Sequence, residues 1–152
     1  MTTERDLDPA SRTSLLPALS TLEVDELLAR STVGRIGVTM SGLPVILPVT
    51  FALAPGGIAV RTGLGTKLAA AARNAVVAFE VDEVDERSRT GWSVAVTGYA
   101  REVTQRQEVA ELEALMLMPW IGADHAGHFV VISTDMITGR RVLPTLAEVV
   151  AI

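Results

Sequence analysis

The segment Arg61-Thr62-Gly-Leu-Gly-Thr66-Lys67 gathers residue types that bind phosphate, and Lys67 is the only lysine among 13 basic residues. Its glycines let the backbone approach a ligand closely, while its hydroxyls, amides and two cations suit an anion. It precedes an alanine-rich run that predicts a helix, whose N-terminal dipole favours negative charge. The P-loop and G-x-G-x-x-G spacings are absent. The alternative interpretation is a Gly-rich turn with a solvated lysine.

A second candidate is the run Leu47-Pro48-Val49-Thr50-Phe51, which has a proline inside an apolar stretch. Proline has no N–H to donate, so it interrupts the hydrogen-bond ladder of a strand. Neighbouring backbone groups are then available to bind the polar edge of a flat heterocycle. The alternative is an ordinary edge strand in which proline prevents pairing with other chains.

Aromatic residues make up only 4% of the chain, which draws attention to the two tryptophans. Trp92 opens an alternating run, and Trp120 follows a proline that ends a helical pattern. Either ring could stack on a planar cofactor or cover it. The alternative is a half-buried tryptophan that fills a barrel mouth or a dimer seam.

The remaining polar groups give weaker signals. Arg140 and Arg141 could reach a phosphate or a ring oxygen, or could simply be surface charges. His125 and His128 lie near Asp124, but no other imidazole or thiolate completes a ligand set, so no metal site is predicted. The G-x-S-x-G pattern of a serine hydrolase is also absent.

Composition narrows the class of protein. The length of 152 residues predicts one domain, and 49% hydrophobic content excludes a disordered chain. The absence of cysteine excludes disulfides and thiolate chemistry. A net charge of −5 argues against a nucleic-acid partner. No apolar run reaches the about 18–20 residues of a membrane span, and the N-terminus lacks signal-peptide features, so a cytoplasmic protein is expected.

Local patterns predict the elements that position the candidate residues. Ser20 and Glu23 form a capping-box pattern at the start of a helix over residues 21–30. Ser41-Gly42 and the Pro-Gly-Gly sequence at 55–57 predict tight turns. Further helices are predicted over 68–73, ending at Asn74, and over 105–118. Strands are predicted over 33–40, 44–53, 58–62, 75–81, 92–103, 128–133 and 137–142.

The fourth of these strands, residues 75–81, is apolar enough to be buried on both faces. Its carboxylate, Glu80, is predicted to point inward with Val76 and Ala78. The acidic residues that follow, over 82–90, are predicted to form an exposed charged connection. Tight turns between consecutive strands require antiparallel pairing, so a small closed barrel with helices at its ends is expected.

Seven short blocks follow one another in a characteristic order within residues 20–142. They are Val33-Gly-Arg-Ile-Gly37, Leu47-Pro-Val-Thr-Phe51, Arg61-Thr-Gly-Leu-Gly-Thr-Lys67, Ala78-Phe-Glu-Val-Asp82, Gly91-Trp-Ser-Val-Ala-Val-Thr-Gly98, Pro119-Trp120 and Ile137-Thr-Gly-Arg-Arg141. Together they resemble the pyridoxamine 5′-phosphate oxidase-like family of FMN-binding split β-barrels. The resemblance implies a mainly β (α+β) protein, with a six- to seven-stranded antiparallel split β-barrel and short flanking helices. Residues 1–19 would form a loose arm, and 20–152 a single flavin-binding domain.

The resemblance also implies a homodimer that holds FMN in a cleft between its two chains. Phosphate binding is implied for Arg61, Thr62, Thr66 and Lys67. Backbone at Pro48, Val49 and Thr50 would meet the isoalloxazine edge. Trp92 and Arg140 are implied to reach the flavin, from the same chain or from the second one. Trp120 is implied to cover the substrate side.

One departure bears on activity. Pyridoxamine phosphate oxidases have a longer C-terminal region with a Trp- and Arg-containing signature, whereas this chain ends soon after Arg141. It is closer to the short bacterial members, so the expected function is a flavin-dependent oxidoreductase acting on an unidentified small molecule. The flavin carries the redox chemistry, and no side chain is assigned a catalytic role. A non-catalytic flavin carrier or sensor, and a barrel that has lost its cofactor and serves as an interaction module, remain alternatives.

The identity of the flavin is also open. FMN and the deazaflavin F420 both present a phosphate or phosphoester to the same cations. The deazaflavin has a long acidic tail, which suits a more basic groove than this acidic chain offers. FMN is therefore the expected cofactor, and F420 is the alternative.

Overall fold

The computed structural model describes residues 18–63, 67–118 and 127–144. Most of the predicted N-terminal arm lies outside these ranges, as does the chain after Pro144, and the proposed domain division stays a prediction. The helices are α2 (Thr21–Arg30), α3 (Lys67–Ala72) and α4 (Arg106–Glu113). The strands are β1 (Val33–Met40), β2 (Leu43–Ala54), β3 (Gly57–Thr62), β4 (Ala75–Asp85), β5 (Thr90–Glu102), β6 (His128–Ile132) and β7 (Met136–Val142).

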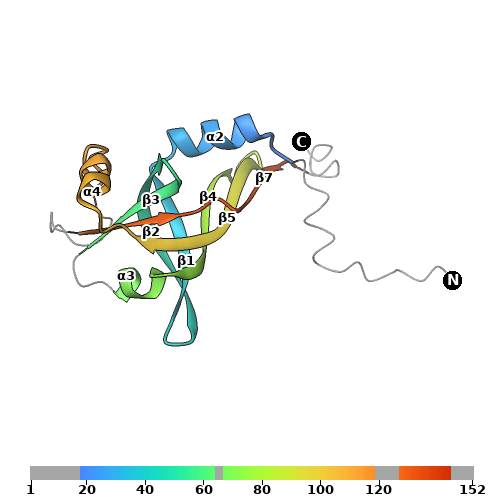
Figure 1. Cartoon of the computed structure of the whole chain (residues 1–152). Helices are drawn as coiled ribbons and strands as arrows, with labels where there is room; N and C mark the ends of the chain where they lie inside the picture. Colours follow the sequence, from blue (N-terminus) through green and yellow to red (C-terminus); the bar gives the residue numbers. More distant parts are fainter. Residues whose placement is uncertain (1–17, 64–66, 119–126, 145–152) are drawn as a thin grey trace.

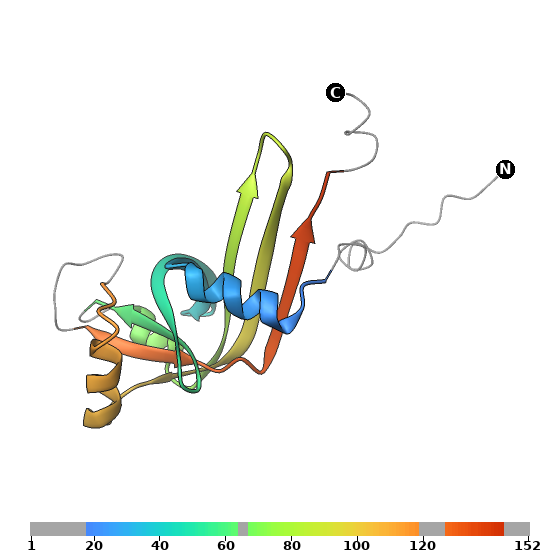
Figure 2. The same ribbon diagram turned by 90° about the horizontal axis from the view of Figure 1, so that it is seen from above.

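Six strands close into an antiparallel barrel in the order β4-β1-β2-β3-β6-β5, because β4 also pairs with β5. The seventh strand, β7, pairs with Gly91–Thr97 of β5, while β6 pairs with Ala100–Glu102. From above, the β4–β5 hairpin and β7 lie side by side and extend away from the rest of the barrel (Figure 2). The predicted fold class, a six- to seven-stranded antiparallel barrel with short helices, is confirmed.

Aliphatic side chains fill the barrel, together with Phe51 and Phe79, whose rings meet edge to face with centroids 4.9 Å apart. The helices complete this core: Val24 and Leu28 of α2 join it, and so does Ala72 of α3. Figure 1 shows α2 and α3 on opposite sides of the strands. Each helix therefore covers apolar surface that an open end of a small barrel would expose to water.

Several local predictions are confirmed. The Ser20 N–H donates to the Glu23 carboxylate at 2.8 Å, and the Glu23 N–H donates to the Ser20 hydroxyl at 3.3 Å, which completes the capping box. Ser41 and Gly42 have φ values of 50° and 79°, as a tight hairpin turn requires. Asn74 follows α3 with φ 54°, the left-handed conformation that ends a helix.

The prediction for the fourth strand is wrong in two respects. β4 is buried on one face only, because Val77 and Phe79 enter the core while Val76 is 56% exposed. Glu80 therefore points to the outer face, not inward. The strand also continues through the acidic residues to Asp85, so the turn covers only 86–89. Hydrogen bonding to β5 extends the strand there, although the side chains alone suggest a loop.

The third predicted helix is shorter than expected. The apolar spacing over 105–118 predicts a continuous helix, yet α4 ends at Glu113 and Met116 has φ 53°, outside the helical region. Leu112 of α4 packs with Phe129 against the outer face of the sheet, separate from the barrel core. No helix in the described parts of the chain is long and apolar enough to span a lipid bilayer.

Candidate functional site

The first half of β2 has a backbone edge that no described strand covers. β2 pairs with β1 over Leu43–Thr50, but with β3 only over Phe51–Ala54. The Phe51 N–H donates to the Thr32 carbonyl at 3.0 Å, so the alternating antiparallel pattern turns the backbone of Pro48 and Thr50 away from β1. Pro48 thus loses no bond to β1 by lacking an N–H, and the uncovered edge agrees with the predicted interruption of the ladder at this proline.

The predicted residues of this run divide between the open edge and the core. Pro48 offers its carbonyl and Thr50 its N–H on the uncovered side, according to the same alternation. Val49 lies opposite Gly34, so its backbone faces β1, and its side chain is buried in the core. Of the three predicted residues, Pro48 and Thr50 therefore present backbone groups at this uncovered edge.

Strands β2 and β3 separate between Thr50 and Arg61. Their ladder ends at the pair Phe51 and Val60, and the next residues along, Thr50 and Arg61, are not paired. β3 instead continues with β6, where Arg61 lies opposite Phe129. The Arg61 guanidinium lies over the Phe129 ring, 5.1 Å from its centroid. The two predicted binding residues thus lie on either side of the point where the barrel opens.

Backbone that follows α4 joins these two side chains. The Arg61 Nη1 donates to the Leu117 carbonyl at 2.9 Å, and the Thr50 hydroxyl donates to the Met118 carbonyl. Met118 is the last described residue before Trp120, the residue predicted for the substrate side. The structure therefore connects the edge of β2, the end of β3 and the chain leading to Trp120.

Thr62 faces the opposite side of β3 from Arg61, so the predicted phosphate set does not share one face. The Thr62 side chain is buried, and its hydroxyl donates to the backbone carbonyl of His128 at 3.1 Å. A side chain at Gly127 would place its Cβ 1.9 Å from the Thr62 carbonyl, so the two backbones are in close contact. Thr62 thereby fixes β3 to the start of β6.

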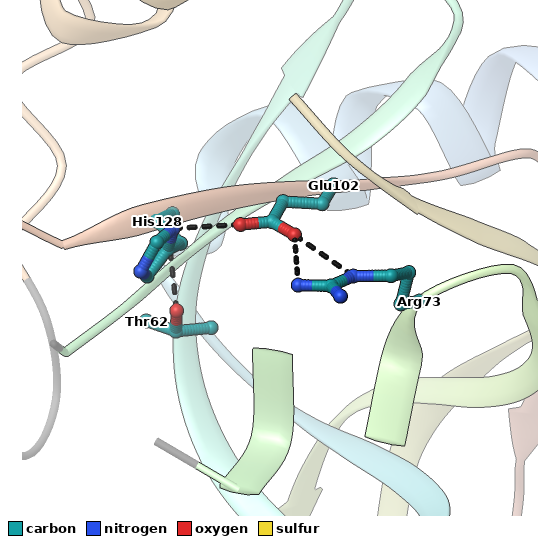
Figure 3. Close-up of polar contacts among 4 residues, drawn as sticks. All are labelled: Thr62, Arg73, Glu102 and His128. Atoms are coloured by element: carbon teal, nitrogen blue, oxygen red, sulfur yellow. Dashed lines mark hydrogen bonds and ion pairs between the residues drawn. The ribbon is translucent and has the colours of Figure 1, made fainter. Parts of the chain in front are cut away.

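An ionic cluster lies at this end of the barrel (Figure 3). The Glu102 side chain is 12% exposed, and its carboxylate contacts two partners, Arg73 and His128. His128 Nδ1 lies 2.7 Å from its Oε1, and Arg73 donates to its Oε2 from Nε at 3.1 Å and from Nη2 at 2.8 Å. The cluster joins the ends of β5 and α3 to the start of β6.

Sequence reasoning missed Glu102 and Arg73, and considered His128 only as a metal ligand. Glu102 closes an alternating strand and Arg73 closes an alanine run, so neither stands out from ordinary surface charge. Their positions 29 residues apart carry no motif. No cluster suited to a metal ion occurs among the described residues, and His125 lies outside them.

Trp92 belongs to the barrel core. It is 6% exposed, lies on the same side of β5 as Val94 and Val96, and carries the Arg30 guanidinium 5.8 Å from its ring centroid. Its Nε1 is buried without a hydrogen-bond partner in the described structure. The structure does not bring Trp92 together with Thr50 or Arg61, and a role at the flavin stays a prediction.

Arg140 lies on a different strand from the other predicted residues. It pairs with Ser93 of β5, and Ser93 pairs with Asp82 of β4, so all three share the outer face of the sheet. Its Nη1 donates to the Gly139 carbonyl at 3.0 Å, while its Nε is buried without a hydrogen-bond partner in the described ranges. No described contact connects Arg140 to Arg61 or Thr50.

The outer face of β4 carries a carboxylate with an altered acidity. Burial, followed by repulsion from Asp82, raises the pKa of Glu80, and Arg35 opposes this effect. Arg35 Nη1 lies 3.5 Å from Glu80 and 3.6 Å from Asp82. Arg35 is also the cross-strand partner of Pro48, so the charged group borders the open edge of β2.

Three other predicted residues cannot be placed by side-chain position. Thr66 and Trp120 lie outside the described ranges. Lys67 is the first residue of α3, which confirms the predicted helix start after the glycines, but its side chain is outside the description.

Comparison with known proteins identifies relatives of this arrangement. Residues 20–141 match a family described as pyridoxamine 5′-phosphate oxidase. An uncharacterised Mycobacterium tuberculosis protein is 39% identical over 126 residues, covering 80% of this chain and 82% of its own. An FAD binding protein from Mycobacterium smegmatis shares 36% identity with a TM-score of 0.73, covering 85% of this chain and all of the other. A Corynebacterium diphtheriae protein of unknown function shares 29% identity with a TM-score of 0.67, covering 85% and 98%.

Proposed function

Because the chain belongs to the pyridoxamine 5′-phosphate oxidase family, we propose that it binds a flavin at the β2–β3 opening and acts as an oxidoreductase. The observation that carries this proposal is the uncovered edge of β2 beside Thr50 and Arg61. A strand edge presents alternating donors and acceptors, which match the pyrimidine edge of an isoalloxazine. When bound, the flavin would supply hydride or electron transfer, and the protein would supply position and electrostatics.

The described residues fit the two ends of such a cofactor. At the edge of β2, the Pro48 carbonyl and the Thr50 N–H face away from β1 and suit the ring system. At the end of β3, Arg61 supplies a guanidinium that can bind a phosphate with two parallel hydrogen bonds. Thr66 and Lys67 complete the phosphate set in this proposal, while the Thr62 hydroxyl holds β6 instead.

The outer face of the sheet supports a homodimer. A row of cross-strand partners runs over five strands and consists of small or apolar residues, with Ile46 and Met136 at its ends, 73% and 66% exposed. The row is Ile46, Gly37, Ala78, Thr97 and Met136. Such an exposed patch is typical of a protein–protein contact, and a second copy of this chain is the proposed partner.

The dimer also explains how separated residues could serve one cofactor. The row begins at Ile46, which precedes Pro48 on the open edge of β2, so a copy bound to this face would border the proposed flavin. Arg140 lies on the same outer face but far along the sheet order from β2. Its buried Nε lacks a hydrogen-bond partner in the described structure, which suits a group reached only in the assembly. In this proposal Arg140 approaches the flavin held by the other chain.

FMN is the proposed flavin, and FAD is a second candidate because the similar Mycobacterium smegmatis protein is described as an FAD binding protein. Both place a phosphate next to the ribityl chain, where Arg61 would bind it. F420 remains the deazaflavin alternative. The purified protein should absorb near the flavin bands, and mass analysis of the released compound will distinguish the three.

Two measurements test the proposal. The protein should take up FMN or FAD in a fluorescence-quenching titration, and the bound flavin should be reduced by NADH, NADPH or reduced F420. A protein that binds none of the three cofactors contradicts the proposal. Bound flavin that no donor reduces without a partner protein would instead identify a carrier or sensor.

A further inference from the structure

Glu102 connects three chain segments through two different carboxylate oxygens. Its Oε1 holds His128, the first residue of β6, and its Oε2 holds Arg73, the residue after α3. The His128 carbonyl in turn accepts a hydrogen bond from the hydroxyl of Thr62, at the end of β3. Figure 3 shows the four residues converging beside α3. The Glu102 side chain thus joins the end of α3 to the first residue of β6, and Thr62 joins the end of β3 to the same residue.

This coupling matters because α3 cannot hold its position unaided. It has six residues, and helices this short are unstable without tertiary contacts. Ala72 anchors its last turn in the core, and Arg73 adds the ionic contact to Glu102. The carboxylate is largely buried whereas Arg73 is 62% exposed, so Glu102 forms the fixed side of the pair. Charge-assisted bonds of this kind are stronger than neutral ones.

We propose that Glu102 is a positioning residue for the flavin phosphate. This inference rests on the proposed function, in which the chain between Arg61 and α3 binds that phosphate. Thr62, directly after Arg61, is fixed through His128, and α3 is fixed through Arg73. Glu102 therefore ties α3, at the end opposite Lys67, to the strand that holds Thr62, and in this proposal it fixes the helix relative to β3 without contacting the cofactor.

The proposal separates phosphate binding from ring binding. In the proposed function the isoalloxazine meets the edge of β2, whereas the Glu102 carboxylate bonds to the start of β6 and to the residue after α3. Loss of Glu102 should therefore weaken a flavin that has a phosphate and spare one that lacks it. Riboflavin and FMN have the same ring system and ribityl chain and differ in the phosphate alone.

The test measures dissociation constants of the full-length protein for FMN and riboflavin by fluorescence quenching. Glu102→Gln keeps the shape of the side chain and removes its charge, and Arg73→Met removes the more exposed partner. Both variants should weaken FMN about tenfold, the loss expected for one charge-assisted hydrogen bond, and change riboflavin less than about twofold. Glu108→Gln is the matched control, because Glu108 also pairs with an arginine, Arg101, and lies outside the cluster. It should leave both affinities unchanged.

Each other result overturns the inference. Unchanged FMN affinity in both variants shows that the cluster does not position the phosphate. Equal losses for FMN and riboflavin, with a lower melting temperature, assign Glu102 to general stability. If the wild-type protein binds FMN no better than riboflavin, there is no phosphate site for Glu102 to position. If it binds neither, the proposed function itself is contradicted.

Discussion

Thr50 and Arg61 donate side-chain hydrogen bonds to adjacent carbonyls, those of Met118 and Leu117. They come from two strands that separate at this point, so the backbone after α4 bridges the opening between β2 and β3. The backbone at Leu117 and Met118 is therefore hydrogen-bonded to both strands. A ligand that binds the Arg61 guanidinium will either replace the Leu117 carbonyl as an acceptor or bind alongside it.

Replacement of Arg61 should reveal how the site handles an anion. Arg61→Met keeps much of the apolar stem that covers Phe129 but removes the charge and the donors. FMN affinity should fall by at least about tenfold, since one charged hydrogen bond is worth about 1.5–3 kcal/mol. Titration of flavin fluorescence measures the change. Arg106→Met, an exposed arginine at the start of α4, is the control and should bind FMN as wild type does. Equal FMN affinity in the two variants would show that Arg61 does not bind the flavin phosphate.

Glu80 predicts a specific pH dependence of stability. Burial and the Asp82 charge raise its pKa in the folded protein. Between the unfolded and folded pKa values, the folded state therefore holds a proton that the unfolded state has released. The contribution of Glu80 is most favourable below its unfolded pKa and is lost as the pH rises through its folded pKa. Glu80→Gln should therefore stabilise the protein at neutral pH, and this gain should vanish as the pH falls toward 4.5.

Chemical denaturation at several pH values measures the Glu80 effect. Because the side chain is 36% exposed, solvent screening keeps the gain below about 1 kcal/mol. Loss of the contact with Arg35 acts in the opposite direction and reduces it further. Glu113→Gln, at the exposed end of α4, is the control. A Glu80→Gln variant that is less stable than wild type at pH 7 would show that the ion pair outweighs desolvation.

Features fixed by neighbouring residues were predictable from the sequence, whereas those set by pairing partners were not. The capping box at Ser20 and the turn at Ser41 follow from residues within three positions of each other. Pro48 also correctly predicted an interruption of the hydrogen-bond ladder, because a missing N–H has the same consequence in any sheet. The direction of Glu80 depended on which face of β4 the chain leaves uncovered, and the Glu102 cluster depended on three distant segments meeting.

The N-cap of α2 should contribute measurably to stability. Ser20→Ala removes the hydroxyl that accepts the Glu23 N–H, which should cost about 1 kcal/mol in the free energy of unfolding. Thermal or urea unfolding measures this loss. The bonds from Ser20, followed by Arg141, lower the pKa of Glu23, so its stabilising effect exists above its unfolded pKa and is lost as the pH falls through its folded pKa. Thr104→Ala, which removes an exposed hydroxyl before α4, is the control; an equal loss there would indicate that the cap adds nothing specific.

The proposed dimer can be tested within the exposed row of residues on the outer face. Thr97 is exposed between Ala78 and Met136, and an arginine there would bring an unpaired charge from each chain into the proposed interface. Thr97→Arg should convert the protein to a monomer of about half the mass by light scattering. Flavin affinity should fall with it, because the proposed contribution of Arg140 comes from the other chain. Thr104→Arg, on the exposed connection before α4, controls for the added charge. A wild-type protein that is already monomeric while it binds flavin fully would contradict the shared site.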